Sequence, residues 1–259
     1  MTVCKYIADC SIADPEAQMQ ILLDATVLPN SSSPYAELDA LYLQLLQVII
    51  PETKRDVQLV ERFQHVIGSI ITLIEPLPVD SLSLITDTPE PQVRVALKQL
   101  SSVISTSSDP QTTPQIYHDS FPDFLQDPTR CSDKNLHVDP SLSNARIASN
   151  CLKLMTSYLK RDICDIKDPS KPNGEVEGLK YRIEAAIAPW LRYACIHWGE
   201  HLAKAKVGHL EVKEHLEEFC MRGAVYWLEA LSLLGCVEIA APFLGQIYGW
   251  AVSKATISF

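Results

Sequence analysis

The strongest constraint on the fold is an apolar stripe at helical spacing between residues 57 and 74. Its members are Val60, Phe63, Ile67, Ile70, Ile71 and Ile74. Residues spaced three or four apart share one face of a helix, so the stripe predicts an amphipathic helix with a buried side. Pro76 and Pro78 end it, because proline lacks a backbone N–H and clashes with the preceding turn. Such a helix needs neighbours that cover its apolar face.

Similar patterns continue along most of the chain, which makes the expected fold class mostly α. Ser33 is a good N-cap, with Pro34 at the first position of an early helix. Two short segments, 102–105 and 115–117, are candidate strands of a small β-hairpin, and residues 168–174 are a turn-rich linker. Further helices are expected at residues 79–85, 90–100, 143–160, 175–187, 190–205, 210–234 and 238–252. Large buried surfaces near the C-terminus are expected from Trp190, Trp198 and Trp227.

Composition limits the class of partner. The chain has 259 residues, 47% of them hydrophobic, which is enough for a sizeable core. Its formal charge of -10 opposes the phosphate field of nucleic acid, so we expect no nucleic-acid partner. No apolar run reaches the roughly 18 residues that span a bilayer. The 8 cysteines form no C-x-x-C pair and no secretory signal precedes them, which favours reduced thiols and a cytoplasmic location.

The segment with the most chemistry is a His-Asp pair at residues 118–119. There a short apolar strand, ending at Tyr117, gives way to an amphipathic helix. Asp119 or Ser120 can cap the start of this helix, where free backbone N–H groups favour an anion. His118 adds a hydrogen-bond donor whose charge depends on pH. The junction predicts contact with an anion, of which a nucleotide phosphate is the obvious example.

The string YHDSFPDFL at residues 117–125 resembles the Met-His-Asp type motif that ends the winged helix of NACHT and related STAND (NLR-like) signalling NTPases. Three more strings are similar to fungal NACHT proteins, which often carry WD repeats: SSPYAELDALY at 32–42, VIGSII at 66–71 and DPTRC at 127–131. The likeness runs from about Pro15 to about Leu234. It implies a helical lead-in at residues 1–56, a winged helix with a β-hairpin at 57–130, and an all-helical domain at 131–259.

In that family the motif histidine contacts the β-phosphate of bound ADP, which implies the same role for His118, with Asp119 as the helix cap that orients it. The chain has no G-x-x-x-x-G-K followed by Ser or Thr, and its 9 glycines are scattered. We therefore expect no enzyme and no cofactor in this chain itself, and read it as a fragment, a truncated gene product or a degenerate paralogue. ADP or ATP would act through a nucleotide-binding core absent from the sequence. The expected partners are that core or further copies of the chain in an oligomer.

Two other interpretations remain open for the His-Asp pair and its neighbours. His118 could simply cap or pack beside Asp119. The whole chain could be a plain interaction module with no nucleotide role.

A different function is suggested by HWGEH at residues 197–201, which fits the H-x-x-E-H pattern of one class of zinc hydrolases. His197 and His201 would bind zinc, and Glu200 would act as general base. Gly199 weakens a helix at this point. The buried stripe of this helix is expected at Leu191, Ala194, Cys195, Trp198 and Leu202, so both histidines should border it, partly exposed. A third ligand is required, and the downstream candidates are Glu211, Glu214, His215, Glu217 and Glu218.

Overall fold

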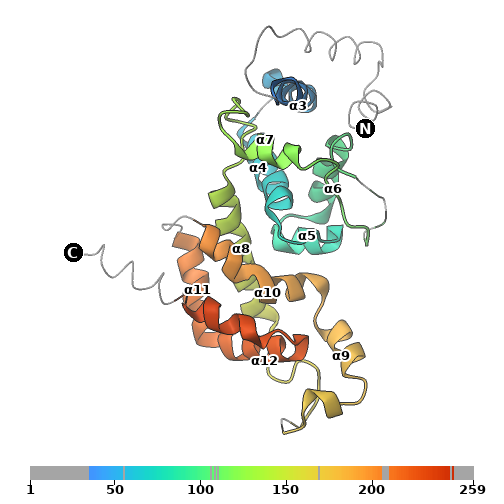
Figure 1. Cartoon of the computed structure of the whole chain (residues 1–259), viewed down its shortest axis with the longest axis vertical. Helices are drawn as coiled ribbons and strands as arrows, with labels where there is room; N and C mark the ends of the chain where they lie inside the picture. Colours follow the sequence, from blue (N-terminus) through green and yellow to red (C-terminus); the bar gives the residue numbers. More distant parts are fainter. Residues whose placement is uncertain are drawn as a thin grey trace, which may run out of the picture. The chain divides into compact units, whose positions relative to one another are not determined.

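The computed structural model describes residues 35–54, 56–105, 107, 109, 111–168, 170–205, 210–245 and 247. The described chain is mostly helical, as expected, and forms two compact units (Figure 1). Unit 1 comprises Met1–Ser83 and Thr88–Pro140, and unit 2 comprises Leu84–Asp87 and Ser141–Phe259. The functional division at residues 56 and 130 stays a prediction. The expected helix cap at Ser33 and most of the lead-in lie outside the described residues.

The helices of unit 1 agree closely with the apolar stripes. They are α3 (Ala36–Ile49), the short 3-10 helix η1 (Glu52–Lys54), α4 (Val57–Thr72), α5 (Val79–Ile85, whose last residues belong to unit 2), α6 (Glu90–Gln99) and α7 (Ser120–Gln126). Asp56 caps α4, since its Oδ1 accepts a hydrogen bond of 2.6 Å from the backbone N–H of Leu59. Phe63 and Ile67 of the predicted stripe are buried in the core. Helix α4 packs against α6, and α3 packs against α7.

The expected strand pair is reduced to one antiparallel bridge between Ile104 and Ile116 within the described part of unit 1. The bridge joins the two predicted segments, because Ser105 donates to the carbonyl of Gln115 at 2.7 Å and Tyr117 donates to that of Val103 at 3.0 Å. The prediction of a strand over 102–105 is wrong. The backbone N–H groups of Val103 and Ile104 both donate to the Leu100 carbonyl, so the chain there is coiled in a turn.

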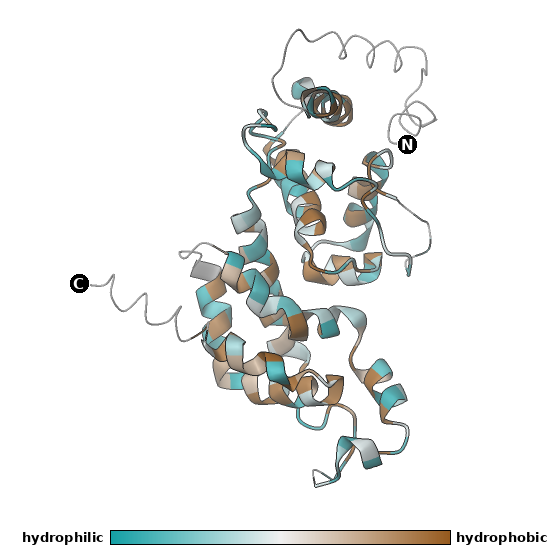
Figure 2. Ribbon diagram, in the orientation of Figure 1, coloured by the Kyte–Doolittle hydropathy of each residue, from teal (hydrophilic) through white to brown (hydrophobic). Residues whose placement is uncertain are grey.

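Unit 2 is built from helices that bear both hydrophobic and hydrophilic faces (Figure 2). They are α8 (Pro140–Tyr158), η2 (Asn173–Glu175), α9 (Leu179–Ala186), α10 (Pro189–Lys204), α11 (Leu210–Arg222), α12 (Ala224–Leu234) and η3 (Val237–Ile239). The single helix expected at 210–234 is wrong, because the chain breaks at Gly223. A Cβ at Gly223 would lie 2.8 Å from the ring of Phe219, so the break also allows close packing. The helix expected at 238–252 lies partly outside the described residues.

An aromatic cluster forms the core of unit 2. Trp198 and Trp227 are fully buried and meet edge to face at 5.6 Å, while Phe219 and Phe243 pack around them. The indole N–H of Trp227 donates to the Cys195 carbonyl at 2.8 Å. Trp190, expected to be buried, is only half-buried against Tyr158. Helix α12 thus joins α10 and α11 in one core.

No helix among the described residues is both long and apolar enough to traverse a lipid bilayer.

Gly199 lies in the middle of α10 because the ring of Phe243 occupies the place of a side chain. A Cβ there would come within 2.5 Å of Phe243 Cγ. We predict that Gly199→Ala lowers the free energy of unfolding. Overpacking costs about 1–3 kcal/mol, which outweighs the roughly 1 kcal/mol that alanine gains in helix propensity. Chemical denaturation measures the change. The control is Gly174→Ala, where a Cβ meets nothing within 4 Å. Equal stability of the two variants would contradict the packing argument.

Candidate functional site: the His118 junction

Helix α7 is capped by His118 and not by the predicted Asp119. Asp119 occupies the N-cap position, but its backbone is helical (φ -61, ψ -22) and its side chain makes no capping hydrogen bond. The backbone N–H of Ser120 instead donates to Nδ1 of His118 at 3.1 Å. A capping side chain needs an extended backbone at the N-cap to reach back to the helix, which Asp119 lacks. Capping by Asp119 is therefore corrected to capping by His118.

Two consecutive hydrogen bonds link the ring of His118 to the core of unit 1 and fix its orientation. Its Nδ1 lies 2.7 Å from Ser120 Oγ, which in turn lies 2.9 Å from the hydroxyl of Tyr42 on α3. Because Nδ1 already accepts the Ser120 backbone N–H, it also accepts from the Ser120 hydroxyl, and Tyr42 donates to that hydroxyl. In the neutral ring the proton must then be on Nε2. Burial raises the pKa of Tyr42, while its hydrogen bond to Ser120 lowers it in part.

Tyr42, the buried end of this hydrogen-bond network, is packed among aromatic side chains. Tyr42 is 1% exposed, and its ring packs against Phe121 at 5.2 Å and Phe124 at 5.5 Å. These aromatic contacts join α3 to α7 directly. The hydrogen-bonded hydroxyl of Tyr42 therefore has little freedom to move.

A half-buried ion pair forms a second contact with α3, at Asp39. Arg130 donates to Asp39 through Nη2 at 2.7 Å and through Nε at 3.1 Å, in a fork-like arrangement. The guanidinium also lies 4.8 Å from the ring centre of Tyr35. The hydrogen bond to Asp39 raises the pKa of Arg130. This pair ties the turn after α7 to the start of α3, so the residues at both ends of α7 are linked to α3.

His118 and Asp119 themselves are exposed. Nε2 of His118 makes no hydrogen bond within the part of the chain that the structure describes, and it lies on the ring edge opposite the Ser120 contact. Asp119 lies at the edge of a cavity of about 350 Å³, which is otherwise lined mainly by apolar side chains such as Ile70, Ile74 and Ile116. Chemically, the junction offers one oriented N–H donor at the surface.

The HWGEH segment on α10 is buried, and the expectation that its histidines are partly exposed is wrong. His201 is 0% exposed and His197 is 6% exposed. Both ring nitrogens of His201 are engaged: Tyr193 O–H lies 2.7 Å from Nε2, and Asn144 Oδ1 lies 2.7 Å from Nδ1. His201 therefore has no lone pair left for zinc.

The other two members of the zinc pattern pair with each other. His197 Nδ1 lies 3.2 Å from Glu200 Oε1. Among the proposed third ligands, His215 contacts Ser149 Oγ through Nδ1 at 2.7 Å. Within the described ranges, no three His, Cys, Asp or Glu side chains gather closely enough to hold a metal ion. The geometry of the histidines gives no support to a zinc hydrolase.

No protein-family model, no curated protein and no solved structure matches this chain. The resemblance to NACHT proteins therefore stays a prediction from the short strings.

Two polar groups that matter here were not found from the sequence. They are the hydroxyl of Tyr42 and the side-chain amide of Asn144. Each meets a partner far along the chain, at Ser120 and His201 respectively. Such pairings carry no local sequence signal.

The buried His201 makes stability depend on pH. Burial lowers its pKa to about 3, with smaller contributions from Lys204 and His197. An unfolded histidine titrates near about 6.5, so the folded state binds fewer protons and stability rises with pH. The contribution of His201 is complete above about pH 6.5 and is lost as the pH falls toward 3, at up to about 1.4 kcal/mol per pH unit.

We therefore predict that the free energy of unfolding falls more steeply between about pH 6.5 and 4.5 in the wild type than in His201→Gln. Denaturant titrations at several pH values measure both slopes. Equal slopes in the two proteins would show that His201 is not held neutral by the fold.

Proposed function

We propose that the chain is a non-catalytic regulatory segment of a NACHT-type signalling protein, and that unit 1 contains a winged helix that senses ADP or ATP. The observation that carries the proposal is the exposed ring of His118, whose inner nitrogen is held by Ser120 and whose Nε2–H is free to donate. The order of elements supports it: α4, α5 and α6 are followed by the Ile104–Ile116 bridge and then by α7. A cytoplasmic location belongs to the same proposal.

In this mechanism the nucleotide is bound by a core that lies outside this sequence. Nε2–H of His118 donates to an oxygen of the ADP β-phosphate and keeps unit 1 closed against that core. A hydrogen bond to a charged acceptor is worth about 1.5–3 kcal/mol, which shifts a two-state equilibrium by about ten- to a hundredfold. Exchange of ADP for ATP would break this contact and release unit 1.

The anchoring of His118 supports a switch of this kind. Tyr42 and Asp39 both lie on α3, so a movement of α3 would disturb the ring through Ser120 and the turn through Arg130. After release, the exposed surfaces of the chain would contact other copies or other proteins. The formal charge of -10 favours protein partners over nucleic acid.

The proposal predicts that His118→Ala weakens ADP retention by about tenfold or more when the chain is joined to a NACHT-type nucleotide-binding core. Release of labelled ADP from the purified fusion measures the effect. The control is His137→Ala, which removes another histidine of unit 1 that has no part in the proposal. Unchanged ADP retention in His118→Ala would rule out the sensor role.

The same fusion tests the remaining alternative, a plain interaction module without a nucleotide role. A ligand that binds only the folded closed state raises the thermal midpoint. If ADP raises the midpoint of the wild-type fusion no more than that of the isolated core, the interaction module is the better account.

A further inference from the structure

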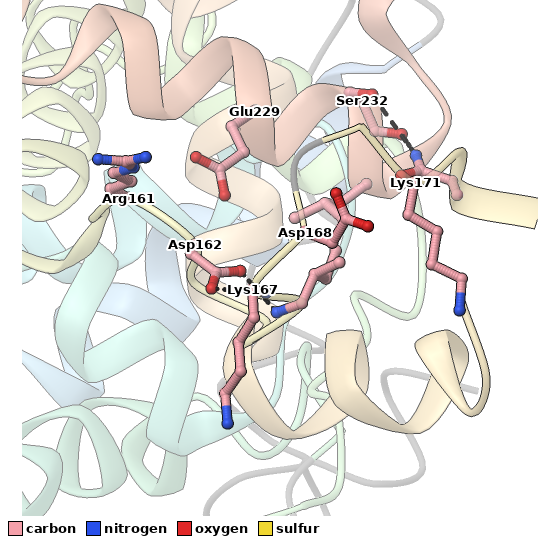
Figure 3. Close-up of a pocket in the computed structure, with 10 residues that line it drawn as sticks. Arg161, Asp162, Lys167, Asp168, Lys171, Glu229 and Ser232 are labelled. Carbon is pink, nitrogen blue, oxygen red and sulfur yellow. Dashed lines mark hydrogen bonds between the residues drawn. The ribbon is translucent and has the colours of Figure 1, made fainter. Parts of the chain in front are cut away.

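Unit 2 carries a cavity that neither the His118 junction nor the histidines of α10 use. It encloses about 440 Å³, within the size range of small-molecule sites. Its walls come from the segment that follows α8, from the start of η2, and from one face of α12 (Figure 3). Residues more than fifty positions apart in the sequence thus line one cavity. An inference about this cavity does not rest on the proposed nucleotide role.

The loop that forms one wall is held in an unusual conformation. Asp162, Asp165 and Lys167 all have positive φ, at 54, 52 and 69 degrees, which is uncommon for residues other than glycine. The carboxylate of Asp162 stabilises this shape, because it accepts from the backbone N–H groups of Ile166 at 2.6 Å and Lys167 at 3.0 Å. The loop therefore has a defined shape before any ligand arrives.

Two contacts outside the loop fix it to its surroundings. Arg182 of α9 donates to the carbonyl of Asp165 at 2.8 Å, and Asn173 Nδ2 donates to the carbonyl of Ser232 on α12 at 3.0 Å. The two walls of the cavity are consequently tied together at one end. A preformed site loses less entropy on binding than one that must first be ordered.

The charges around the cavity balance. Three side chains are basic and three are acidic: Arg161, Lys167, Lys171, Asp162, Asp168 and Glu229. Two of the acidic side chains accept hydrogen bonds from the loop itself. Asp162 accepts from the backbone as described, and Asp168 accepts from Ser170 N–H at 3.0 Å and Ser170 Oγ at 2.6 Å. Within the described residues, Glu229 and Arg161 make no side-chain hydrogen bond or ion pair.

The view of the cavity shows how these groups are arranged. The ammonium groups of Lys167 and Lys171 extend away from the carboxylates of Asp162, Asp168 and Glu229 (Figure 3). Arg161 is drawn on the same side of this view as Glu229, at the opposite end from Lys171. The cavity therefore offers both a guanidinium and a carboxylate to a ligand. A simple anion would meet three carboxylates and a simple cation three basic groups, whereas a ligand with both charges complements the lining.

We propose that this cavity binds a small zwitterion, namely an amino acid or short peptide with free amino and carboxylate ends. The ligand's ammonium group pairs with Glu229, and its carboxylate pairs with Arg161, where a guanidinium can form two parallel hydrogen bonds. The buried Leu233 and the half-buried Ile166 supply an apolar surface between them.

Three dipeptides that differ in their end groups test this proposal on the wild-type chain. L-alanyl-L-alanine has both charges, its N-acetyl form has only the carboxylate, and its amide form has only the ammonium. We expect the zwitterion to bind at millimolar concentration and to shift backbone amide NMR signals of residues 161–173 and 229–233. Each capped form should bind at least about tenfold more weakly, because one charged hydrogen-bonding group is lost. No binding of the zwitterion, or equal binding of all three, overturns the proposal.

Matched variants assign the two charged contacts. Glu229→Gln and Arg161→Gln should each weaken L-alanyl-L-alanine binding at least about tenfold. Glu184→Gln, which changes an exposed carboxylate of α9 outside the cavity, should leave binding unchanged. Circular dichroism confirms that each variant is folded. If folded Glu229→Gln binds the zwitterion as tightly as the wild type, Glu229 does not hold the ammonium group and the assignment fails.

Discussion

The arrangement of unit 1 depends on one buried hydroxyl. Ser120 Oγ lies between the Tyr42 hydroxyl and His118 Nδ1, among the aromatic rings that join α3 to α7. A buried hydroxyl without partners would cost about 1–3 kcal/mol, so both bonds must form when the helices pack. The packing that buries Ser120 thereby also orients an imidazole at the surface. Core stability and the geometry of the candidate site are set by the same contacts.

In unit 2, helix α12 contributes to both the core and the cavity. One face of this helix supplies Trp227 and Leu231 to the aromatic core, while another supplies Glu229 and Ser232 to the cavity. The core holds α12 fixed on α10, and the Asn173 contact ties the opposite wall to it. The buried polar groups of α10 belong to this scaffold, because His201 is satisfied by Tyr193 and Asn144.

The sequence predicted the helices well and their detailed contacts poorly, for physical reasons. Apolar spacing gave α5 its observed bounds, but it could not show that Gly223 interrupts 210–234. Asp56 caps its helix because its backbone is extended (ψ 163), whereas Asp119 has ψ -22 and does not; spacing alone does not distinguish them. Apolar spacing predicts that His201 lies at the border of the core, but Tyr193 and Asn144 contact it and it is buried. The cavity joins segments far apart in the chain, so no local pattern marks it.

The central claim is that the fold presents His118 as a donor through Nε2. The direct test is nitrogen-15 NMR of the His118 imidazole in the wild-type chain and in Tyr42→Phe, at a pH where the ring is neutral. The account predicts a ring protonated on Nε2 in both proteins, because the Ser120 backbone N–H still donates to Nδ1 when the Tyr42 hydroxyl is removed. A wild-type ring protonated on Nδ1 would contradict it.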